Sequence, residues 1–209
     1  MDDPDDALTV YSDYVCPFCY LGRASLEQYQ ESREDDLRID WHPFDLRSGK
    51  RTPDGSIDHS VDDGKDEEYF EQARQNVQRL AEQYDVEMEL DIARDVDSLP
   101  AQVVSYYLRE HHDYDTWLAF DEAVFEALWT EGRDIGEASV LVALAGEAGV
   151  EASEVRAALD DDDLHEAVRE RFGAAARQGV RGVPTFAYDG YAARGAVPPE
   201  QLRRLVEGR

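Results

Sequence analysis

The chain has 209 residues, 42% of them hydrophobic, which is enough to bury the core of one domain or of one domain with an inserted second one. It carries 48 acidic residues against 21 basic ones, a net charge of −27 at pH 7 that repels phosphate backbones and disfavours nucleic acid as a partner. No run approaches about 18 apolar residues and the N-terminus MDDPDDALTV is acidic, so we expect a cytoplasmic protein without membrane contact.

The acidic residues are spread along the whole chain, and Lys50 and Lys65 are the only lysines. Their mutual repulsion weakens the compact state in dilute buffer. At about 1 M salt the Debye length falls to roughly 3 Å, so most of this repulsion is screened. The composition therefore suggests a halophilic host; the alternative is an ordinary acidic protein.

The first elements follow a β-α-β pattern. The runs ALTVYSDY (7–14) and LRIDWHPF (37–44) are short and apolar or alternating, which is typical of strands. Between them, residues 16–33 consist mainly of helix formers, with Gly22 as the single internal breaker. Residues 45–66 are rich in polar residues, glycine and proline, so we expect an exposed connection.

From about residue 70 to residue 178 the apolar periodicity is helical. Breaks at DVDSLP, EGRDIGE, AGVEAS and DDDD divide this region into four or five predicted amphipathic helices. Strand character returns at VPTFAYD (183–189), followed by a turn at Gly190 and a second short strand. The final segment PPEQLRRLVE begins with prolines, as the first turn of a helix often does.

The two cysteines, Cys16 and Cys19, form the motif CPFC at the junction between the first strand and the first helix. Zinc is disfavoured because a structural site needs four ligands and the five histidines show no paired spacing. A structural disulfide across so short a loop removes little entropy from the unfolded chain. Two unrelated buried thiols are the remaining simple alternative.

A redox-active dithiol suits this position best. The first turn of a helix offers unpaired N–H groups and the positive end of the helix dipole, and both favour a thiolate. Pro17 fits the helix start because it has no N–H group to leave unpaired. We expect Cys16 to be the more exposed, attacking sulfur, and Cys19 to resolve the mixed disulfide.

The order of strand, CPFC, helix, strand, helical region, GVPTF, strand and helix resembles the DsbA-like branch of the thioredoxin superfamily. The segments DYVCPFCYLG and DWHPFDL are similar to those of its FrnE-type members. The resemblance covers nearly the whole chain. It implies an α/β, thioredoxin-like fold formed by residues 1–63 and 161–209, with an inserted helical domain at residues 64–160.

The resemblance also implies a cis peptide bond between Val183 and Pro184, lying against the dithiol, with the Val183 backbone pairing with an extended substrate. Substrate contacts are expected at Pro17, Phe18, Val183 and Pro184. From the residues alone, Pro184 is equally well explained as a proline at the start of a strand.

One residue departs from the pattern of DsbA proteins in oxidising compartments, which often carry histidine where this chain has Phe18. A cationic imidazole is therefore missing beside Cys16. We expect a weaker oxidant than those proteins, whose potential is about −120 mV, and a reductase or isomerase role in practice.

The remaining candidates for the site have weaker support from the sequence. Asp13, three residues before Cys16, is a candidate for proton transfer, although a solvated acid is the simpler explanation in so acidic a chain. His42 is a candidate for contact with the site, with a hydrogen-bonded structural role as the simpler alternative. Several aromatic residues are candidates for an apolar groove or for the core: Tyr14, Phe18, Tyr20 and Phe186.

The predicted function is thiol-disulfide oxidoreduction on a protein or low-molecular-weight disulfide, with a further redox partner that regenerates the dithiol. No metal and no cofactor are expected beyond the Cys16–Cys19 disulfide. Two alternatives stay open. One is a glutathione-dependent or polyketide-type isomerase, as in the related 2-hydroxychromene-2-carboxylate isomerases and kappa-class glutathione transferases, which use a serine in place of the first cysteine. The other is a redox-sensing binding or chaperone module.

Overall fold

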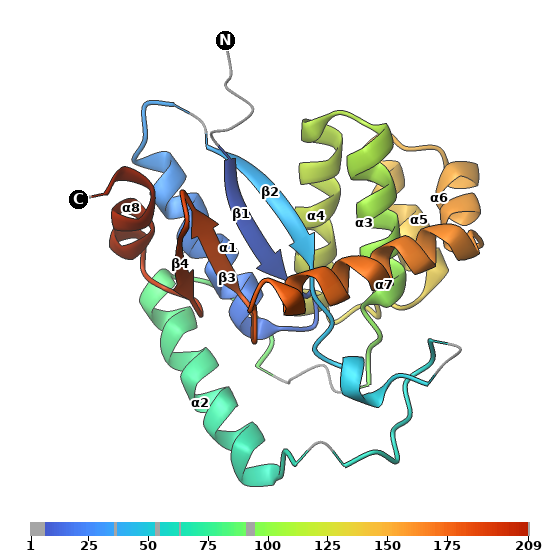
Figure 1. The fold of residues 1–209 in the computed structure, drawn as a ribbon, viewed down its shortest axis with the longest axis horizontal. Helices are drawn as coiled ribbons and strands as arrows, with labels where there is room; N and C mark the ends of the chain where they lie inside the picture. The colour runs from blue at the N-terminus through green and yellow to red at the C-terminus, as the bar shows by residue number, and fades with distance from the viewer. Residues whose placement is uncertain (1–6, 36, 53–54, 63, 91–94, 209) are drawn as a thin grey trace.

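A computed structural model describes residues 7–35, 37–52, 55–62, 64–90 and 95–208 of the chain (Figure 1). The described residues form four strands, eight α-helices and one short 3₁₀ helix. In chain order these are β1 (Ala7–Ser12), α1 (Pro17–Glu31), β2 (Arg38–Pro43), the 3₁₀ helix η1 (Ser48–Lys50), α2 (Glu67–Tyr84), α3 (Leu99–His111), α4 (Tyr114–Trp129), α5 (Ala138–Glu147), α6 (Ala152–Leu159), α7 (Asp162–Arg177), β3 (Thr185–Tyr188), β4 (Tyr191–Arg194) and α8 (Pro199–Glu207).

The four strands form one mixed sheet in the order β2-β1-β3-β4. β1 and β2 are parallel and are joined by α1, whereas β3 is antiparallel to both β1 and β4. At the centre of the sheet, Val10 is in register with Trp41 on one side and Phe186 on the other. This topology confirms the predicted α/β, thioredoxin-like fold, with a helical insertion between its two halves.

Between residues 67 and 177 the structure has six helices, α2 to α7, rather than the four or five predicted for this region. The missed boundary lies between α3 and α4. There the Asp113 carboxylate caps α4 by accepting a hydrogen bond from the Thr116 N–H at 2.9 Å. In Figure 1, helices α3 to α6 stand beside β2, whereas α2 extends away from the body on the other side of the sheet.

The connection between β2 and α2 is less exposed than its composition suggests. Asp45 is only 4% exposed, and the Arg51 side chain is largely buried beside it. An isolated bridge between Arg51 and Ile57 closes part of this loop. The expectation of an exposed connection is therefore wrong for its first half, because an ion pair between Arg51 and Asp97, just before α3, holds it against the body.

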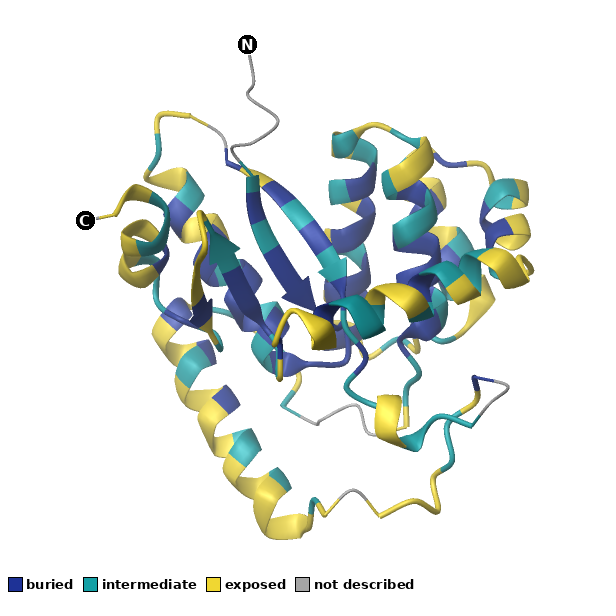
Figure 2. Cartoon of the chain, viewed as in Figure 1, coloured by how far each residue is buried: buried dark blue, intermediate teal, exposed yellow. Residues whose placement is uncertain are grey.

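One hydrophobic core extends from the sheet into the insertion, and Figure 2 shows it as the dark blue inner faces of β1, β3, α3 and α4.

A buried polar network crosses this core. The Tyr14 hydroxyl donates to Asp121 at 2.8 Å, and Asp121 is paired with Arg23 at 3.0 Å. The indole N–H of Trp129 donates to the main-chain oxygen of Tyr14 at 2.8 Å. These contacts anchor the segment just before the cysteines against α4.

The proposed division into residues 1–63 with 161–209 and residues 64–160 stays a prediction, and residues 1–6, 63 and 209 of those ranges lie outside the described part of the chain. Within that part, no helix is both long and apolar enough to cross a membrane.

Candidate functional site

The two cysteines lie at the N-terminus of α1. Cys16 is the N-cap residue, Pro17 is the first helical residue, and Cys19 lies one turn further on. The Cys16 N–H donates to the main-chain oxygen of Asp13 at 3.0 Å, and the Cys16 oxygen accepts the Cys19 N–H at 2.9 Å. Both are free thiols. The turn therefore holds the two side chains close to the electropositive end of α1.

Both thiols are buried, Cys16 at 4% exposed and Cys19 at 1%. Cys16 is the more exposed of the pair, as expected, but only narrowly. Burial raises the pKa of the Cys19 thiol well above its ordinary value, and the neighbouring Cys16 raises it further. The Asp13 backbone acts in the opposite direction by hydrogen bonding to the sulfur. Cys19 is therefore a protonated thiol at neutral pH.

The second part of the site comes from the loop before β3. The Cys16 thiol contacts the main-chain oxygen of Val183 at 3.6 Å, although the two residues are 167 positions apart. The peptide bond between Val183 and Pro184 is cis. Thr185 then begins β3, which pairs with β1 at Tyr11. The sheet thus brings Cys16, Val183 and Pro184 together, as the resemblance implies.

Gly22 allows α1 to approach this loop closely. A Cβ atom at Gly22 would lie 3.1 Å from both Pro184 Cγ and Phe186 Cζ. Such a distance is too short for comfortable packing. The glycine therefore sets how near the Pro184 loop can lie to the helix that carries the cysteines.

Asp13 is buried at 1% exposure, so the simpler explanation of a solvated acid is wrong. Its carboxylate accepts hydrogen bonds from the Leu46 N–H at 2.9 Å, the Val15 N–H at 3.3 Å and the Gln102 amide at 3.4 Å. Burial raises the pKa of Asp13 to about 6, against the lowering effect of hydrogen bonds from Ser98, Leu46 and Val15. A buried carboxyl group that titrates near neutral pH, on the residue whose main-chain oxygen accepts the Cys16 N–H, is suited to proton transfer.

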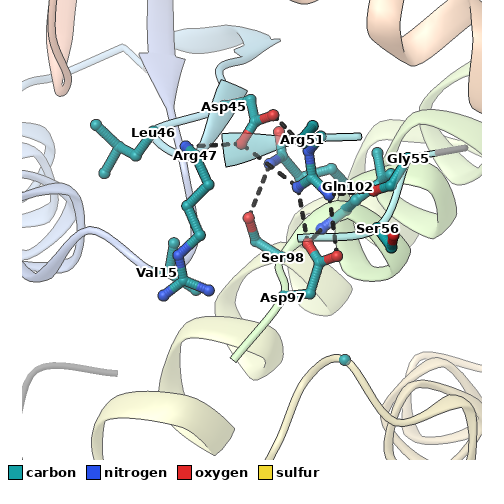
Figure 3. A network of polar contacts seen from close by, with 12 residues as sticks. Val15, Asp45, Leu46, Arg47, Arg51, Gly55, Ser56, Asp97, Ser98 and Gln102 are labelled. Carbon is teal, nitrogen blue, oxygen red and sulfur yellow. Dashed lines mark hydrogen bonds and ion pairs between the residues drawn. The ribbon is translucent and has the colours of Figure 1, made fainter. Parts of the chain in front are cut away.

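Arg51 forms ion pairs with Asp45 and Asp97, two residues close in sequence to groups that contact Asp13 (Figure 3). Arg51 Nε lies 2.5 Å from Asp45 Oδ2, and Arg51 Nη2 lies 2.7 Å from Asp97 Oδ1. Asp45 precedes Leu46, whose N–H donates to Asp13, and Asp97 lies just before α3, which carries Gln102. The sequence gives no signal for this network, because its members are ordinary charged residues and Arg51 lies 46 positions from Asp97.

The remaining predicted residues divide between surface and core. Pro17 is buried, whereas Phe18 and Tyr20 are half-buried around the helix start. Tyr14 and Phe186 are each 1% exposed and belong to the core rather than to a groove.

His42 lies 3.2 Å from Asp40 and packs its ring at a tilt against Tyr11, which is the structural role considered simpler for it. Among the described residues, no group of three or more His, Cys, Asp or Glu side chains is arranged to hold a metal ion.

The chain is similar in sequence to a known family and to a protein of another organism. The family model of the DSBA-like thioredoxin domain matches residues 7–207. The uncharacterized protein YwbO of Bacillus subtilis is 28% identical over 207 residues, covering 95% of this chain and 94% of YwbO.

Two solved structures share the fold. A probable DsbA oxidoreductase of Streptomyces coelicolor has a TM-score of 0.77 at 24% identity, covering 97% of this chain and 88% of that one. A 2-hydroxychromene-2-carboxylate isomerase has a TM-score of 0.75 at 20% identity, covering 97% of this chain and 93% of that one.

Proposed function

The chain belongs to the family of DSBA-like thioredoxin domains, and from this premise we propose that it is a thiol-disulfide oxidoreductase. One observation carries the proposal. Cys16 and Cys19 share the first turn of α1, and the Cys16 sulfur lies 3.6 Å from the Val183 oxygen that precedes Pro184. A site of this kind holds an attacking thiol, a resolving thiol and a main-chain segment that can align a partner.

In the first step, the Cys16 thiolate attacks one sulfur of a partner disulfide. A bond forms between Cys16 and that sulfur, the partner's S–S bond breaks, and the other partner sulfur leaves as a thiolate. The position of Cys16 at the N-cap supports the thiolate through the dipole of α1. The main-chain groups of Val183, beside Cys16, are suited to pairing with an extended partner segment.

In the second step, Cys19 attacks Cys16 and releases the partner. The Cys19 thiol first loses its proton, for which Asp13 is the proposed acceptor because its carboxyl group has a pKa of about 6. The new Cys19–Cys16 bond replaces the bond between Cys16 and the partner, whose sulfur leaves as a thiolate and takes up a proton. The partner is thereby reduced and the dithiol oxidised, and a second thiol partner must reduce it again.

The surroundings of Cys16 indicate what kind of disulfide can react. Because Cys16 is only 4% exposed, a partner sulfur can reach it only along a narrow approach. This favours a low-molecular-weight disulfide, or a disulfide in an extended and flexible protein segment, over one inside a rigid fold. The net charge of −27 disfavours strongly anionic partners, and we propose a cytoplasmic setting in which reduction is the usual direction.

An isomerase is the second candidate, because the fold is also similar to that of a 2-hydroxychromene-2-carboxylate isomerase. The presence of both cysteines argues against it, since isomerase chemistry of the serine type does not need a resolving thiol. A redox-sensing binding module would have no need for a resolving thiol either, because it does not turn over a disulfide substrate.

Turnover assays separate these functions. We expect the wild type to accelerate the reduction of insulin by dithiothreitol, and Cys16→Ser to abolish this acceleration. An activity that survives Cys16→Ser would favour the isomerase or the binding module instead.

A further inference from the structure

Ser12 occupies a position where the sequence pattern calls for an apolar residue. It is the last residue of β1, and the alternation of this strand places its side chain on the same face as Leu8 and Val10. That face packs in the core cluster that also contains Cys16 and Cys19. Ser12 is 2% exposed, so its hydroxyl group lies in the interior.

The Ser12 hydroxyl has no hydrogen-bond partner among the described residues. The other buried serines differ in this respect. Ser25 donates to the Val197 oxygen at 2.6 Å, Ser98 accepts from Gln102 at 3.1 Å, and Ser105 accepts from the Trp117 indole at 2.9 Å. A buried hydroxyl without a partner destabilises a fold, so its presence here calls for a role other than stability.

The neighbouring group that can use this hydroxyl is the Cys19 sulfur. Of the polar groups acting on Cys19, the Ser12 side chain and the Asp13 backbone both lower the pKa of the thiol, against the effect of burial and of Cys16. A thiol is a weak acceptor, whereas a thiolate is a strong one. Among the described residues the hydroxyl therefore has no partner in full hydrogen-bond geometry in the resting dithiol, and it gains a strong acceptor when Cys19 loses its proton.

We infer that Ser12 is a further catalytic residue, whose hydroxyl donates a hydrogen bond to the Cys19 sulfur as this sulfur becomes an anion and attacks the mixed disulfide. The inference rests on the proposed function and adds a residue to its second step. Ser12 keeps its own proton throughout. The Cys19 proton passes to Asp13, the bond between Cys19 and Cys16 forms, and the bond between Cys16 and the partner breaks.

Ellman's reagent, added to the reduced protein at one equivalent in molar KCl, tests this step separately from the first. Cys16 attack releases one coloured thiolate and leaves the second bound as a mixed disulfide, which Cys19 then releases. Stopped-flow absorbance therefore shows two phases, the first reporting Cys16 and the second reporting Cys19. The variants to compare are Ser12→Ala, Ser12→Thr as the variant that restores the hydroxyl, and Ser25→Ala as a buried serine on α1 that has a partner.

We expect Ser12→Ala to leave the first phase unchanged and to slow the second about three- to fourfold. Losing the donor lowers the thiolate fraction about tenfold, and the higher nucleophilicity of the more basic sulfur recovers part of this. The pH at which the second phase reaches half its maximal rate should move upward. The titrating group beside Cys19, which is Cys16, is unchanged in this variant, and so is Asp13, whose backbone contacts Cys19.

Ser12→Thr should restore the second phase, and Ser25→Ala should slow neither phase. Ser12→Ala should also unfold at the same or a higher denaturant concentration than the wild type, because it removes an unpaired polar group.

The inference is overturned if the second phase of Ser12→Ala keeps the wild-type rate and pH profile, or if both phases slow together with a loss of stability. A wild type that shows neither phase would overturn the proposed function itself, and with it this inference.

Discussion

The thiol of Cys16 lies 3.6 Å from the main-chain oxygen of Val183, a residue 167 positions later in the chain. Two antiparallel strands produce this contact, because β3 is aligned with β1 from Tyr11 to Thr9 and its preceding loop therefore ends beside the start of α1. The proposed chemistry depends on this arrangement, since it sets the attacking sulfur next to main-chain groups that can align a partner.

Gly22→Ala tests how closely α1 must approach the Pro184 loop. The added methyl would lie 3.1 Å from Pro184 and Phe186, and we expect a loss of about 1–3 kcal/mol in the free energy of unfolding despite the better helix propensity of alanine. Thiol-disulfide turnover should fall as well, because the loop is pushed away from Cys16. Denaturant titration and the insulin assay measure the two effects.

Gly146→Ala on α5 is the matched control, because no atom lies within 4 Å of a Cβ built there. This variant should be more stable than the wild type by about 0.5–1 kcal/mol, with unchanged turnover. Equal behaviour of the two variants would show that the close packing at Gly22 has no consequence.

Asp13→Asn tests the buried carboxyl group through the pH dependence of stability. The pKa of Asp13 rises from 3.8 to about 6 on folding, so between these values the folded chain keeps a proton that the unfolded chain has lost. The wild type therefore loses stability relative to the variant as pH rises through this window, by about 3 kcal/mol in total. Below about pH 4 and above about pH 6 the difference should be flat.

Denaturant titrations of both proteins from pH 4 to pH 8 measure this difference directly. Glu110→Gln, at an exposed residue of α3, serves as the control and should show no comparable change. A difference between wild type and Asp13→Asn that stays constant across the range would contradict the assignment of Asp13 as a buried, titrating acid.

Arg51→Met tests the ion pairs of Arg51 with Asp45 and Asp97. The substitution leaves Asp45, which is 4% exposed, without its cation, and we expect a loss of about 3–5 kcal/mol in the free energy of unfolding. Arg74→Met, at the exposed pair with Glu71, should cost less than about 1 kcal/mol. If the two variants lose the same stability, the Arg51 network does not anchor the connection between β2 and α2.

Much of the fold and part of the site could be predicted from the sequence, because they rest on local patterns. The strands, the first helix and the paired cysteines follow from periodicity and from the CPFC and GVPTF motifs. The extra helix boundary at Asp113 was missed because two histidines and an aspartate interrupt the periodicity only briefly.

The burial of Asp13 could not be predicted, for a physical reason. Its environment is built by Leu46 and Gln102, which are 33 and 89 positions away, and nothing local distinguishes it from the other acidic residues. The unpaired hydroxyl of Ser12 is hidden in the same way, because a serine at the end of a strand ordinarily faces water. Both the burial of Asp13 and the environment of Ser12 depend on tertiary packing, which the apolar periodicity of the sequence does not reveal.

The high negative charge predicts that stability increases with salt. Because the net charge is −27, screening by molar KCl should raise the midpoint of thermal unfolding markedly over dilute buffer. Sucrose at equal osmolality is the control, since it favours burial without screening charge. A midpoint that responds equally to both, or to neither, would remove the basis for the halophilic hypothesis.

The most direct test of the central claim is to trap the mixed disulfide. Cys19→Ser, incubated with oxidised glutathione and analysed by peptide mass spectrometry, should retain one glutathione on Cys16, because no second thiol can release it. The wild type should instead show a Cys16–Cys19 disulfide and no adduct, and Cys16→Ser should react slowly because Cys19 is buried. An adduct that forms on Cys19 in preference to Cys16, or that persists on the wild type, would contradict the assignment of attacking and resolving thiols.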